Sequence, residues 1–323
     1  MILGAGLGAR MEPLSRHWAK PALPILDEPL VLGLIRALAD QGVEAAVVNA
    51  HAHPESLVDA LRAVPIPVEV SMETELLGSG GGIRHAHRFL ESSDPFLVLN
   101  GDMRLDLDLA ALLDAHARGG GIATLALKDD PRKRSFGSIG YDGANRVRRI
   151  TQLLDLGGEV ASGLFVGVHV MDPRIFQHMP DREAFETLPD VYLPALQKGE
   201  RIHCWLHPPE CEWLPVGSPR ELLDANLGAL RTMVDPRHGE GIGVFVAESA
   251  RVDGHLEAPA WIGADAEVAA SAQVGPWAVI SAGSRVPPGT RVEHALLLPG
   301  AHPPAGVDLS RAIAFAAEVW RDA

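Results

Sequence analysis

Glycines and two cations near the start of the chain have a spacing that suits phosphate binding. Gly4, Gly6 and Gly8 follow a short apolar run, and Arg10 and Lys20 are the nearest positive side chains. Glycines allow backbone N–H groups to point into one concavity and hold phosphate oxygens, while fixed cations neutralise a triphosphate. A short glycine pattern is weak by itself, so a glycine-rich turn with two surface cations is the alternative.

A carboxylate follows a second apolar run. Residues 96–100 read FLVLN, an unbroken apolar segment typical of a strand covered on both faces, and Asp102 comes just after it. Ligands bind at the carboxyl edge of the sheet in open α/β folds. Asp102 is therefore a candidate site residue, and the alternative is a turn aspartate after Gly101.

Histidines and cysteines raise the question of a metal site. Side chains that can bind zinc gather in one segment, at His203, Cys204, His207 and Cys211. Residues 201–206 read as a strand, in which neighbours face opposite sides, so a structural role is favoured. His51 and His53 precede an expected helix near the ligand edge, where solvent-facing histidines are favoured over ligands.

Composition excludes several classes of function. The chain has 323 residues, 28 basic and 42 acidic side chains, and a net charge of −14, which disfavours a nucleic-acid partner. Two cysteines are too few for a disulfide framework. No secretory signal and no apolar run of membrane-spanning length is evident in the sequence. We therefore expect a soluble, cytoplasmic protein with neither a nucleic-acid nor a membrane partner.

The elements that must position these residues alternate between strand and helix in the first part of the chain. Apolar runs predict strands, and segments with helical periodicity follow them; the strands are expected at 43–49, 67–71 and 96–100, and the helices at 30–42, 53–63 and 81–92. After residue 120 the pattern is mixed, with strands expected at 122–127, 137–141 and 164–170 and helices at 188–199 and 218–230. The alternation predicts a doubly wound, Rossmann-like α/β sheet.

The C-terminal part has a different pattern. Aliphatic residues recur every six positions, at Leu256, Ile262, Val268, Val274, Ile280, Val286, Val292 and Leu298. This period predicts a parallel β-helix of hexapeptide repeats, in which each repeat supplies one short strand. We expect the linker at residues 235–241, and domains at 1–236, 237–303 and 304–323, the last being a tail with a short capping helix. The β-helix is expected to serve homo-oligomerisation or regulation.

The N-terminal motif resembles the signature of the sugar-1-phosphate nucleotidylyltransferases, G-x-G-T-R-x-x-P followed by P-K-P. Gly6, Gly8, Arg10 and Pro13 match, as do Lys20 and Pro21, while alanine replaces the threonine and the first proline. The resemblance implies a nucleotidyltransferase fold with a mixed sheet, often followed by a left-handed β-helix. It assigns Arg10 and Lys20 to the nucleotide phosphates and the transferring group, and Leu3, Gly4, Gly6 and Gly8 to the nucleotide.

Three more segments carry the resemblance, which covers nearly the whole chain. Residues 73–83 resemble the base-contacting loop E-x-x-x-L-G-T-A-G, with Glu73 and Gly78 matching. Their triple glycine is similar to the mannose-1-phosphate guanylyltransferase and N-acetylmuramate-1-phosphate uridylyltransferase branches more than to the glucose-specific ones. Residues 96–106 resemble the strand that ends in the family's metal aspartate, which is Asp102 here. Residues 165–176 resemble the sugar-pocket strand, with Gly167 matching and Phe165 at the usual asparagine. Phe136 and Gly137 match the loop beside the sugar.

The reaction implied by this resemblance joins a sugar 1-phosphate to the α-phosphorus of a nucleoside triphosphate and releases pyrophosphate. Positioning and charge neutralisation supply most of the catalysis, and the attacking phosphate is already an anion, so no general base is required. The implied cofactor is Mg²⁺, which bridges the two phosphates and takes Asp102 as its protein ligand. Gly137, Gln152 and Gly167 are the implied sugar-phosphate residues.

Two positions depart from the family pattern. In W-x-D-x-G-T-P the aspartate is a second metal ligand, but Pro215 stands there, framed by Trp213, Gly217 and Pro219. In E-K-P, which binds the sugar and its phosphate, the corresponding residues are Gln152, Leu153 and Leu154. Arg148, Arg149 and the run at 131–134 are candidate substitutes for the missing lysine. For all of them, however, a solvated position is favoured.

Three functions remain open at this point. An active nucleotidylyltransferase is favoured by Arg10, Lys20 and Asp102, and a non-catalytic nucleotide-sugar-binding subunit is favoured by Pro215 and Leu153. An acyltransferase with His294 as base is the weakest, because the repeats contain no long insertion beside this histidine. The sequence names neither the base nor the sugar.

Overall fold

The computed structural model describes residues 1–133, 137–232 and 243–322. The chain divides into two compact units, each formed by segments that are separate in sequence. The first unit contains Met1–Leu7, Ala19–Pro21 and Val31–Leu214, and the second contains Gly8–Trp18, Ala22–Leu30 and Pro215–Ala323. The chain therefore passes between the units several times within its first thirty-one residues.

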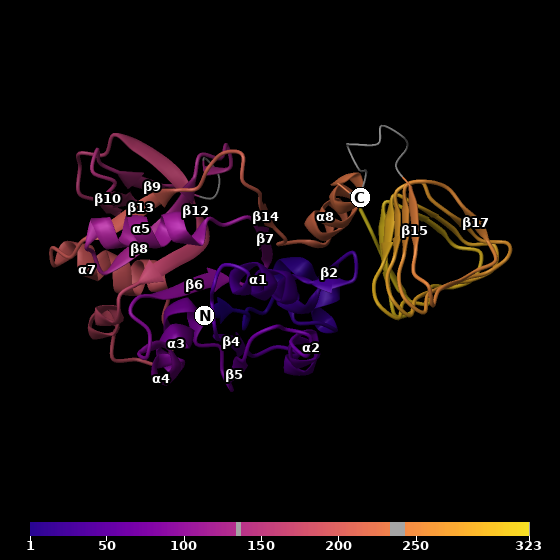
Figure 1. Cartoon of the computed structure of the whole chain (residues 1–323), viewed down its shortest axis with the longest axis horizontal. Helices are drawn as coiled ribbons and strands as arrows, with labels where there is room; N and C mark the ends of the chain where they lie inside the picture. The colour runs from indigo at the N-terminus through magenta and orange to yellow at the C-terminus, as the bar shows by residue number, and fades with distance from the viewer. Residues whose placement is uncertain (134–136, 233–242, 323) are drawn as a thin grey trace. The chain divides into compact units, whose positions relative to one another are not determined.

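The first unit is built on a mixed, ten-stranded sheet (Figure 1). Its parallel part has the order β6-β1-β4-β5, with bounds β1 Ile2–Leu3, β4 Ala46–Ala50, β5 Val68–Met72 and β6 Phe96–Asn100. The long strand β12 (Ala161–Met171) runs antiparallel to β6 and joins the rest of the sheet. That part comprises β8 Ala123–Lys128, β9 Ile139–Tyr141, β10 Val147–Ile150, β11 Leu154–Asp155 and β13 Ile202–Leu206.

Burial explains why these segments form strands. Every residue of β4 is buried, and β8 is buried up to its final lysine, as expected for strands covered on both faces. Apolar side chains from β6, β8 and β13 pack with those of the helices in one core. The mixed α/β sheet predicted from the sequence is confirmed.

Helices connect the strands and cover the sheet, with bounds α1 Leu30–Ala39, α2 Pro54–Ala60, α3 Gly78–His85, α4 His87–Leu90, α5 Leu109–Gly119 and α7 Leu193–Gln197. Local chemistry sets the ends of α5: the Asp108 carboxylate accepts a hydrogen bond from Ala111 N at 2.9 Å, and Gly120 follows with φ 62°. A π-helical turn at Leu188–Tyr192 leads into α7, which confirms the helix expected there.

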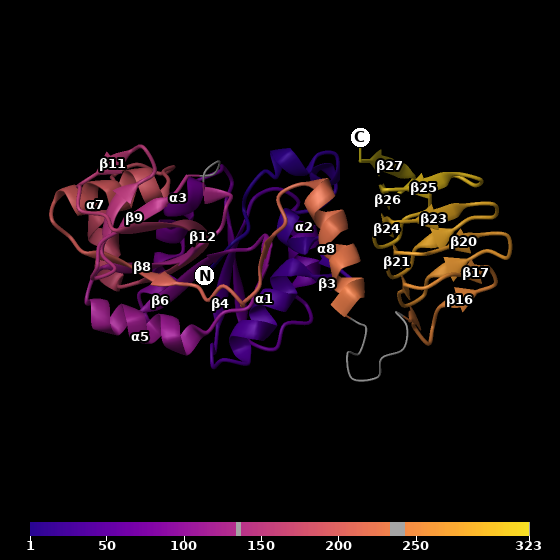
Figure 2. The ribbon, with the colours of Figure 1, turned by 90° about the horizontal axis from the view of Figure 1, so that it is seen from above.

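The second unit contains a region of parallel strands in three sheets, which we call the three-sheet region (residues 244–321). Up to residue 297 consecutive strands visit the sheets in turn, and Figure 2 shows their coils stacked on one another. The sheets have the orders β15-β18-β21-β24-β26-β27, β16-β19-β22 and β17-β20-β23-β25. This arrangement is consistent with a parallel β-helix.

The strands of the three-sheet region are short, as expected for repeats of six residues. Their bounds are β15 Val244–Val246, β16 Arg251–Val252, β17 His255–Leu256, β18 Ala260–Ile262, β19 Glu267–Val268, β20 Gln273–Val274, β21 Ala278–Ile280, β22 Arg285–Val286, β23 Arg291–Glu293, β24 Ala295–Leu297, β25 Asp308–Ser310, β26 Ala312–Phe315 and β27 Glu318–Arg321. Six of the periodic aliphatic residues, from Ile262 to Val292, lie in the buried core, and Leu256 packs against it. The six-residue period therefore marks the inward-facing side chains.

Helix α8 (Pro219–Thr232) packs against the three-sheet region at β21, β24 and β26 and against the small hairpin of β2 (Pro24–Ile25) and β3 (Glu28–Pro29). Asn226 of α8 fixes this hairpin, because its side chain accepts a hydrogen bond from Leu26 N at 2.9 Å and donates one to Pro24 O at 3.1 Å. The helix expected at 218–230 is thus confirmed.

The prediction of a capping helix at the end of the chain is wrong. Residues 308–321 form β25, β26 and β27. β25 pairs in parallel with β23, and β26 and β27 form an antiparallel hairpin. The linker at 235–241 lies outside the described residues, so the predicted boundary between 236 and 237 stays a prediction.

In the described ranges, none of the helices combines the length and the apolar character that a membrane crossing requires.

Candidate functional site

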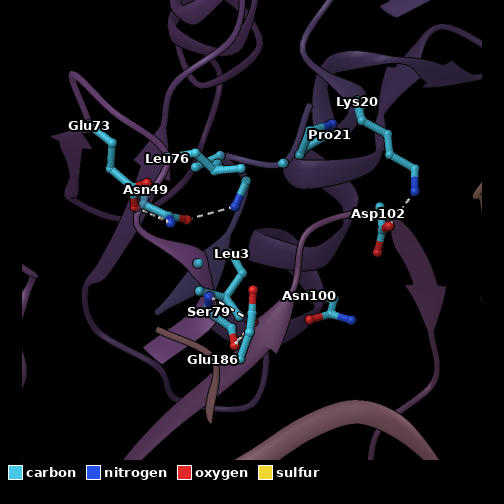
Figure 3. Close-up of a pocket in the computed structure, with 14 residues that line it drawn as sticks. Leu3, Lys20, Pro21, Asn49, Glu73, Leu76, Ser79, Asn100, Asp102 and Glu186 are labelled. Atoms are coloured by element: carbon cyan, nitrogen blue, oxygen red, sulfur yellow. Dashed lines mark hydrogen bonds and ion pairs between the residues drawn. The ribbon is translucent and has the colours of Figure 1, made fainter. Parts of the chain in front are cut away.

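A pocket with a volume of about 270 Å³ lies in the first unit, where β1, β4 and β6 end (Figure 3). The fourteen residues that line it come from these strand ends and from the segments around Lys20, Gly78 and Glu186: Leu3, Gly4, Ala5, Gly6, Lys20, Pro21, Asn49, Glu73, Leu76, Gly78, Ser79, Asn100, Asp102 and Glu186. In the order β6-β1-β4-β5, the strands β4 and β5 lie on one side of β1 and the later strand β6 lies on the other. The direction in which the chain adds strands to the sheet therefore reverses at β1. Ligands of open α/β sheets bind at this switch point.

Lys20 and Asp102 form the charged centre of the pocket. Nζ of Lys20 and Oδ2 of Asp102 make an ion pair, and Figure 3 shows the two side chains pointing toward one another. The Lys20 side chain is 12% exposed and that of Asp102 is 32% exposed. A fixed cation and a carboxylate thus share a half-open pocket, an arrangement that can bind both an anion and a divalent cation.

Two glycines of the turn at the pocket, Gly4 and Gly6, have different surroundings. Gly4 N donates a hydrogen bond to Oδ1 of Asn49 at 2.7 Å, and a Cβ on Gly4 would lie 2.8 Å from Asn49 O. The Gly4 N–H is therefore used within the protein. At Gly6 a Cβ would meet no heavy atom within 4 Å, so space beside Gly6 is free for a ligand.

Glu73 organises the loop that follows β5. The side chain is 5% exposed, and its two oxygens accept hydrogen bonds from Asn49 Nδ2 at 2.7 Å and from Leu77 N at 3.1 Å. His51 Nδ1 lies 3.0 Å from the carbonyl oxygen of Glu73. The Glu73 carboxylate therefore holds the loop in place through both oxygens.

Ser79 stands in place of the threonine of the family's base-contacting loop, and Glu186 was not singled out by sequence reasoning. Oε2 of Glu186 accepts hydrogen bonds from Ser79 N at 3.1 Å and from Ser79 Oγ at 2.6 Å. The carbonyl oxygen of Phe185 accepts from Gly80 N and Gly81 N at 3.0 and 3.1 Å. The triple glycine was the available signal, because a Cβ on Gly80 would lie 2.5 Å from the Phe185 ring.

Asn49 and Asn100 were also missed. Each lies in or at the end of a strand that borders β1. A Cβ on Gly167, which has φ 80°, would collide with the Asn100 amide. The close approach of β12 to β6 therefore requires glycine at position 167.

The three sugar-phosphate candidates are not among the lining residues of this pocket. Gly137 has φ 89°, and a Cβ there would lie 2.8 Å from Cγ2 of Thr151. Thr151 N donates to Ser138 O at 2.9 Å, which brings the turn containing Gln152 beside Gly137. Gly167 lies within β12, against Asn100. Phe136 lies outside the described residues.

The candidate substitutes for the family's lysine that the structure describes have partners within the protein. Arg149 donates to Glu159 at 2.7 Å and to Ser138 and Thr151. Arg148 donates to the carbonyl oxygens of Leu156 and Gly157. In the 131–134 run, Arg132 binds Asp130 and Lys133 binds Asp129, and Arg134 is outside the described residues. The Arg132 hydrogen bond also lowers the pKa of the Asp130 carboxyl.

Gly8, Arg10 and Pro215 belong to the second unit. Gly8 has φ 61° and precedes a turn of 3₁₀-helix at Ala9–Met11. A Cβ on Gly217 would lie 3.1 Å from Nη2 of Arg10, so glycine at 217 leaves room for the guanidinium group. Pro215 ends strand β14 (Trp213–Pro215).

The candidate zinc ligands of the sequence are His203, Cys204, His207 and Cys211. In the described part of the chain, no group of three or more His, Cys, Asp or Glu side chains is placed to hold a metal ion. Cys204 is buried in β13, and burial raises the pKa of its thiol to about 12. The structural role favoured for this segment is consistent with these observations.

Comparisons with known proteins agree with the fold. The family model described as Nucleotidyl transferase matches residues 1–232. A mannose-1-phosphate guanyltransferase of Aspergillus oryzae is 28% identical over 231 residues, which are 69% of this chain and 62% of the relative. A UTP–glucose-1-phosphate uridylyltransferase of Synechocystis is 25% identical over 287 residues, which are 81% of this chain and 73% of the relative.

Among solved structures, HddC from Yersinia pseudotuberculosis is similar with a TM-score of 0.59 and 23% identity, covering 71% of this chain and 97% of HddC. This likeness concerns the fold. The match to the A. oryzae relative spans only 62% of that protein's length. The family model, in contrast, covers well over half of this chain. The chain therefore belongs to the nucleotidyl transferase family.

Proposed function

We propose that the protein transfers a nucleoside monophosphate from a nucleoside triphosphate to a sugar 1-phosphate and releases pyrophosphate. The observation that carries this proposal is the Lys20–Asp102 ion pair beside the glycine turn, at the switch point of the sheet. The names of the relatives, which act on mannose 1-phosphate or glucose 1-phosphate, support the class of substrate. The base and the sugar stay open.

The proposed step is an in-line displacement at the α-phosphorus. A phosphate oxygen of the sugar 1-phosphate forms the new bond, and the bond from the α-phosphorus to the bridging oxygen of the β-phosphate breaks. Pyrophosphate leaves with that electron pair. Lys20 would neutralise charge on the phosphates, and the resemblance assigns Arg10 the same task. The space beside Gly6 would admit the phosphates.

The donor set at Asp102 fits Mg²⁺ held mainly by phosphates and water. Mg²⁺ prefers oxygen ligands and usually keeps several waters, with one or two carboxylates from the protein. Asp102 would hold it, supported by the neighbouring amide of Asn100 in the same pocket. When bound, Mg²⁺ would supply charge neutralisation between the attacking phosphate and the α-phosphate.

A nucleotide-sugar-binding subunit without turnover is the second candidate. Two observations favour it: proline stands at position 215, where it offers no side-chain oxygen, and Leu153 is 57% exposed with no charge to hold a phosphate. For the acyltransferase, His294 is a single residue between β23 and β24, so no protruding loop accompanies it.

We also propose that the three-sheet region is a left-handed β-helix of hexapeptide repeats that supports homo-oligomerisation. The inward-facing aliphatic residues at six-residue intervals support the β-helix, and homo-oligomerisation stays a prediction from the sequence. The cytoplasmic location stays a prediction from the sequence.

Pyrophosphate release tests the activity. The full chain is assayed with Mg²⁺ over a matrix of four NTPs and several sugar 1-phosphates. We expect release with at least one pair, and loss of release in Asp102→Ala but not in Asp114→Ala, which removes an exposed carboxylate on α5. Binding of a nucleotide sugar without turnover would instead support the regulatory subunit.

The variant Pro215→Asp tests the cause of any low activity. It restores the oxygen ligand that the family motif places there, so we expect a rise in kcat in Mg²⁺. An unchanged kcat would show that the missing carboxylate does not limit the reaction.

A further inference from the structure

A second cavity lies within the first unit, beside helix α3. Its volume is about 580 Å³, which falls within the range of small-molecule sites in proteins. The side chains that can carry charge in its lining are Arg84, His85, His87, Arg88, Glu73 and Glu183. The proposed reaction leaves this cavity without a role.

Basic side chains form one continuous part of the lining. Residues 84–88 read RHAHR, with two arginines and two histidines in five positions, in a chain of 28 basic and 42 acidic side chains. Gly81, Arg84 and His85 lie three and four residues apart on one face of α3, and Arg88 follows in α4. The cavity therefore has a local excess of positive charge on an acidic protein.

Arg84 is a fixed cation in this cavity. Its guanidinium group donates hydrogen bonds to Pro180 O at 2.6 Å and to Arg182 O, and lies 4.8 Å from the centroid of the Phe185 ring. Among the residues that the structure describes, no carboxylate pairs with it. A guanidinium group has five N–H donors, so these two contacts leave donors for a ligand on a side chain that is already ordered.

Arg88 and His85 have donors that the fold does not use. Arg88 is exposed, and within the described ranges its side chain makes neither a hydrogen bond nor an ion pair. Nδ1 of His85 lies 3.0 Å from Oγ of Ser71, which orients the imidazole and leaves Nε2 open. His87 is different, because its Nε2 lies 3.3 Å from Oε2 of Glu91. The ligand-binding groups are therefore Arg84, His85 and Arg88.

The two carboxylates of the lining do not cancel these charges. Both oxygens of Glu73 accept hydrogen bonds within the protein, from Asn49 and Leu77. Glu183 is exposed, and in the described part of the chain it forms no ion pair with either arginine, so solvent screens its charge. Arginine donors match phosphate oxygens, and a phosphate dianion balances two arginines.

Apolar surface lies beside the basic side chains. Met72 and Leu77 line the same cavity, and Met72 is 49% exposed. A Cβ on Gly81 would collide with Glu183 O, so glycine at 81 lets the segment that carries Glu183 approach α3. The cavity thus offers a basic part for an anionic group and an apolar part for the organic group attached to it.

We propose that this second cavity binds a small phosphate monoester. Arg84, His85 and Arg88 hold the phosphate group, and Met72 and Leu77 contact the organic group. Among the described residues, Glu73 alone lines both this cavity and the candidate pocket. The proposal therefore adds a second ligand site to the first unit, and it does not depend on turnover at the candidate pocket.

Calorimetric titration of the full chain with inorganic phosphate and with phenyl phosphate tests the site. The titrations use Lys20→Gln, which removes a fixed cation of the candidate pocket and so weakens phosphate binding there. We expect saturable binding of both probes, with phenyl phosphate the tighter because its ring adds apolar contact. Arg88→Gln in the same background should weaken both about tenfold or more, since it removes a charge-assisted hydrogen bond.

Arg118→Gln is the matched control, because Arg118 is an exposed arginine in the last turn of α5, outside the cavity. It should leave both dissociation constants unchanged. Arg84→Gln should weaken binding as Arg88→Gln does. If Arg84→Gln does not fold, because it loses the bonds to Pro180 and Arg182, Arg88→Gln still decides the question, since Arg88 has no described partner to lose.

Hydrogen–deuterium exchange locates the bound probe. Phenyl phosphate should slow the exchange of amides in residues 77–88 of the Lys20→Gln chain, and this protection should be absent after Arg88→Gln. Ligand binding orders the groups that it contacts, so protection elsewhere alone would place the probe outside this cavity.

Three results would overturn the proposal. The first is the absence of saturable binding in the Lys20→Gln chain, and the second is equal weakening by Arg118→Gln and Arg88→Gln. The third is equal affinity for inorganic phosphate, sulfate and phenyl phosphate, which would show an adventitious ion only. A wild-type chain that releases no pyrophosphate would contradict the proposed function instead, and the titrations would still decide the role of this cavity.

Discussion

At the scale of single residues, Asn49 connects two motifs of the pocket. Its side chain is buried and accepts a hydrogen bond from Gly4 N while donating one to Glu73. The glycine turn and the loop after β5 therefore share one amide group. A Cβ on Gly82 would lie 2.6 Å from Nδ2 of Asn49, so the glycine run also makes room for it.

Replacing Asn49 should therefore disturb both motifs. Asn49→Ala leaves the Gly4 N–H and one oxygen of a buried carboxylate without a partner, and we expect a loss of about 3 kcal/mol in the free energy of unfolding. Asn49→Asp should be at least as harmful, because it places a second carboxylate against Glu73. Urea unfolding measures both changes. Gln197→Ala, which removes an exposed amide at the end of α7, should leave the stability unchanged.

The sequence and the structure agree on part of the pocket. Leu3, Gly4, Gly6, Lys20, Glu73, Gly78 and Asp102 all line it, although their roles in catalysis stay predictions. Asn49 and Glu186 could not be found from the sequence, because each depends on partners 24 to 107 residues away. The continuous N-terminal motif also gave no sign that Gly8 and Arg10 pack in a different unit from Gly6.

At the scale of elements, β12 carries a buried histidine. Nδ1 of His169 lies 2.8 Å from the Tyr192 hydroxyl, and complete burial lowers the pKa of His169 to about 3. The folded protein thus holds this ring neutral, whereas the unfolded chain takes up a proton as the pH falls below about 6.5. The contribution of His169 to stability is complete above that pH and is lost toward pH 3.

Stability should depend on pH accordingly. Each pH unit between about 6.5 and 3 should cost about 1.4 kcal/mol through His169, which is about 2 kcal/mol between pH 6.5 and pH 5. Urea unfolding of the wild type and of His169→Asn, which does not titrate, separates the contribution of His169 from the contributions of the other histidines. The expected result is a flatter pH dependence for the variant; parallel curves would show that His169 is not the cause.

The last strands show why the prediction of a helix at the end of the chain was wrong. Residues 308–321 are rich in alanine and lack the six-residue period, which favours a helix by local propensity. In the structure β25 pairs with β23, and β26 pairs with β24. Pairing with strands already in place decides the conformation here, and local propensity cannot show it.

At the scale of the whole molecule, the second unit depends on contacts between distant segments. The Asp27 carboxylate satisfies the N–H groups of Trp261 and Ala282, and burial raises the pKa of that carboxyl. Asp27 itself has φ 78°, in the left-handed region, and Leu26 beside it has φ 53°. Leu26 and Asp27 form the tip of the β2–β3 hairpin, which is held in place by the three-sheet region and by Asn226 of α8.

Removing the Asp27 carboxylate should loosen the second unit. Asp27→Ala leaves two N–H donors without their partner, so we expect a loss of about 2 kcal/mol and a lower Tm by calorimetry. Asp253→Ala removes an exposed carboxylate from the same region and serves as control. Equal melting temperatures for Asp27→Ala and the wild type would contradict the importance of this contact.

The contact of His17 and Trp18 with Phe315 has a consequence for the order of folding during synthesis. The ribosome makes the two partners almost a full chain length apart, and such non-local contacts form late. A nascent chain that has not yet reached β26 presents His17 and Trp18 without their aromatic support. The packing of the segment that carries Arg10 is therefore completed only after the last coils have formed.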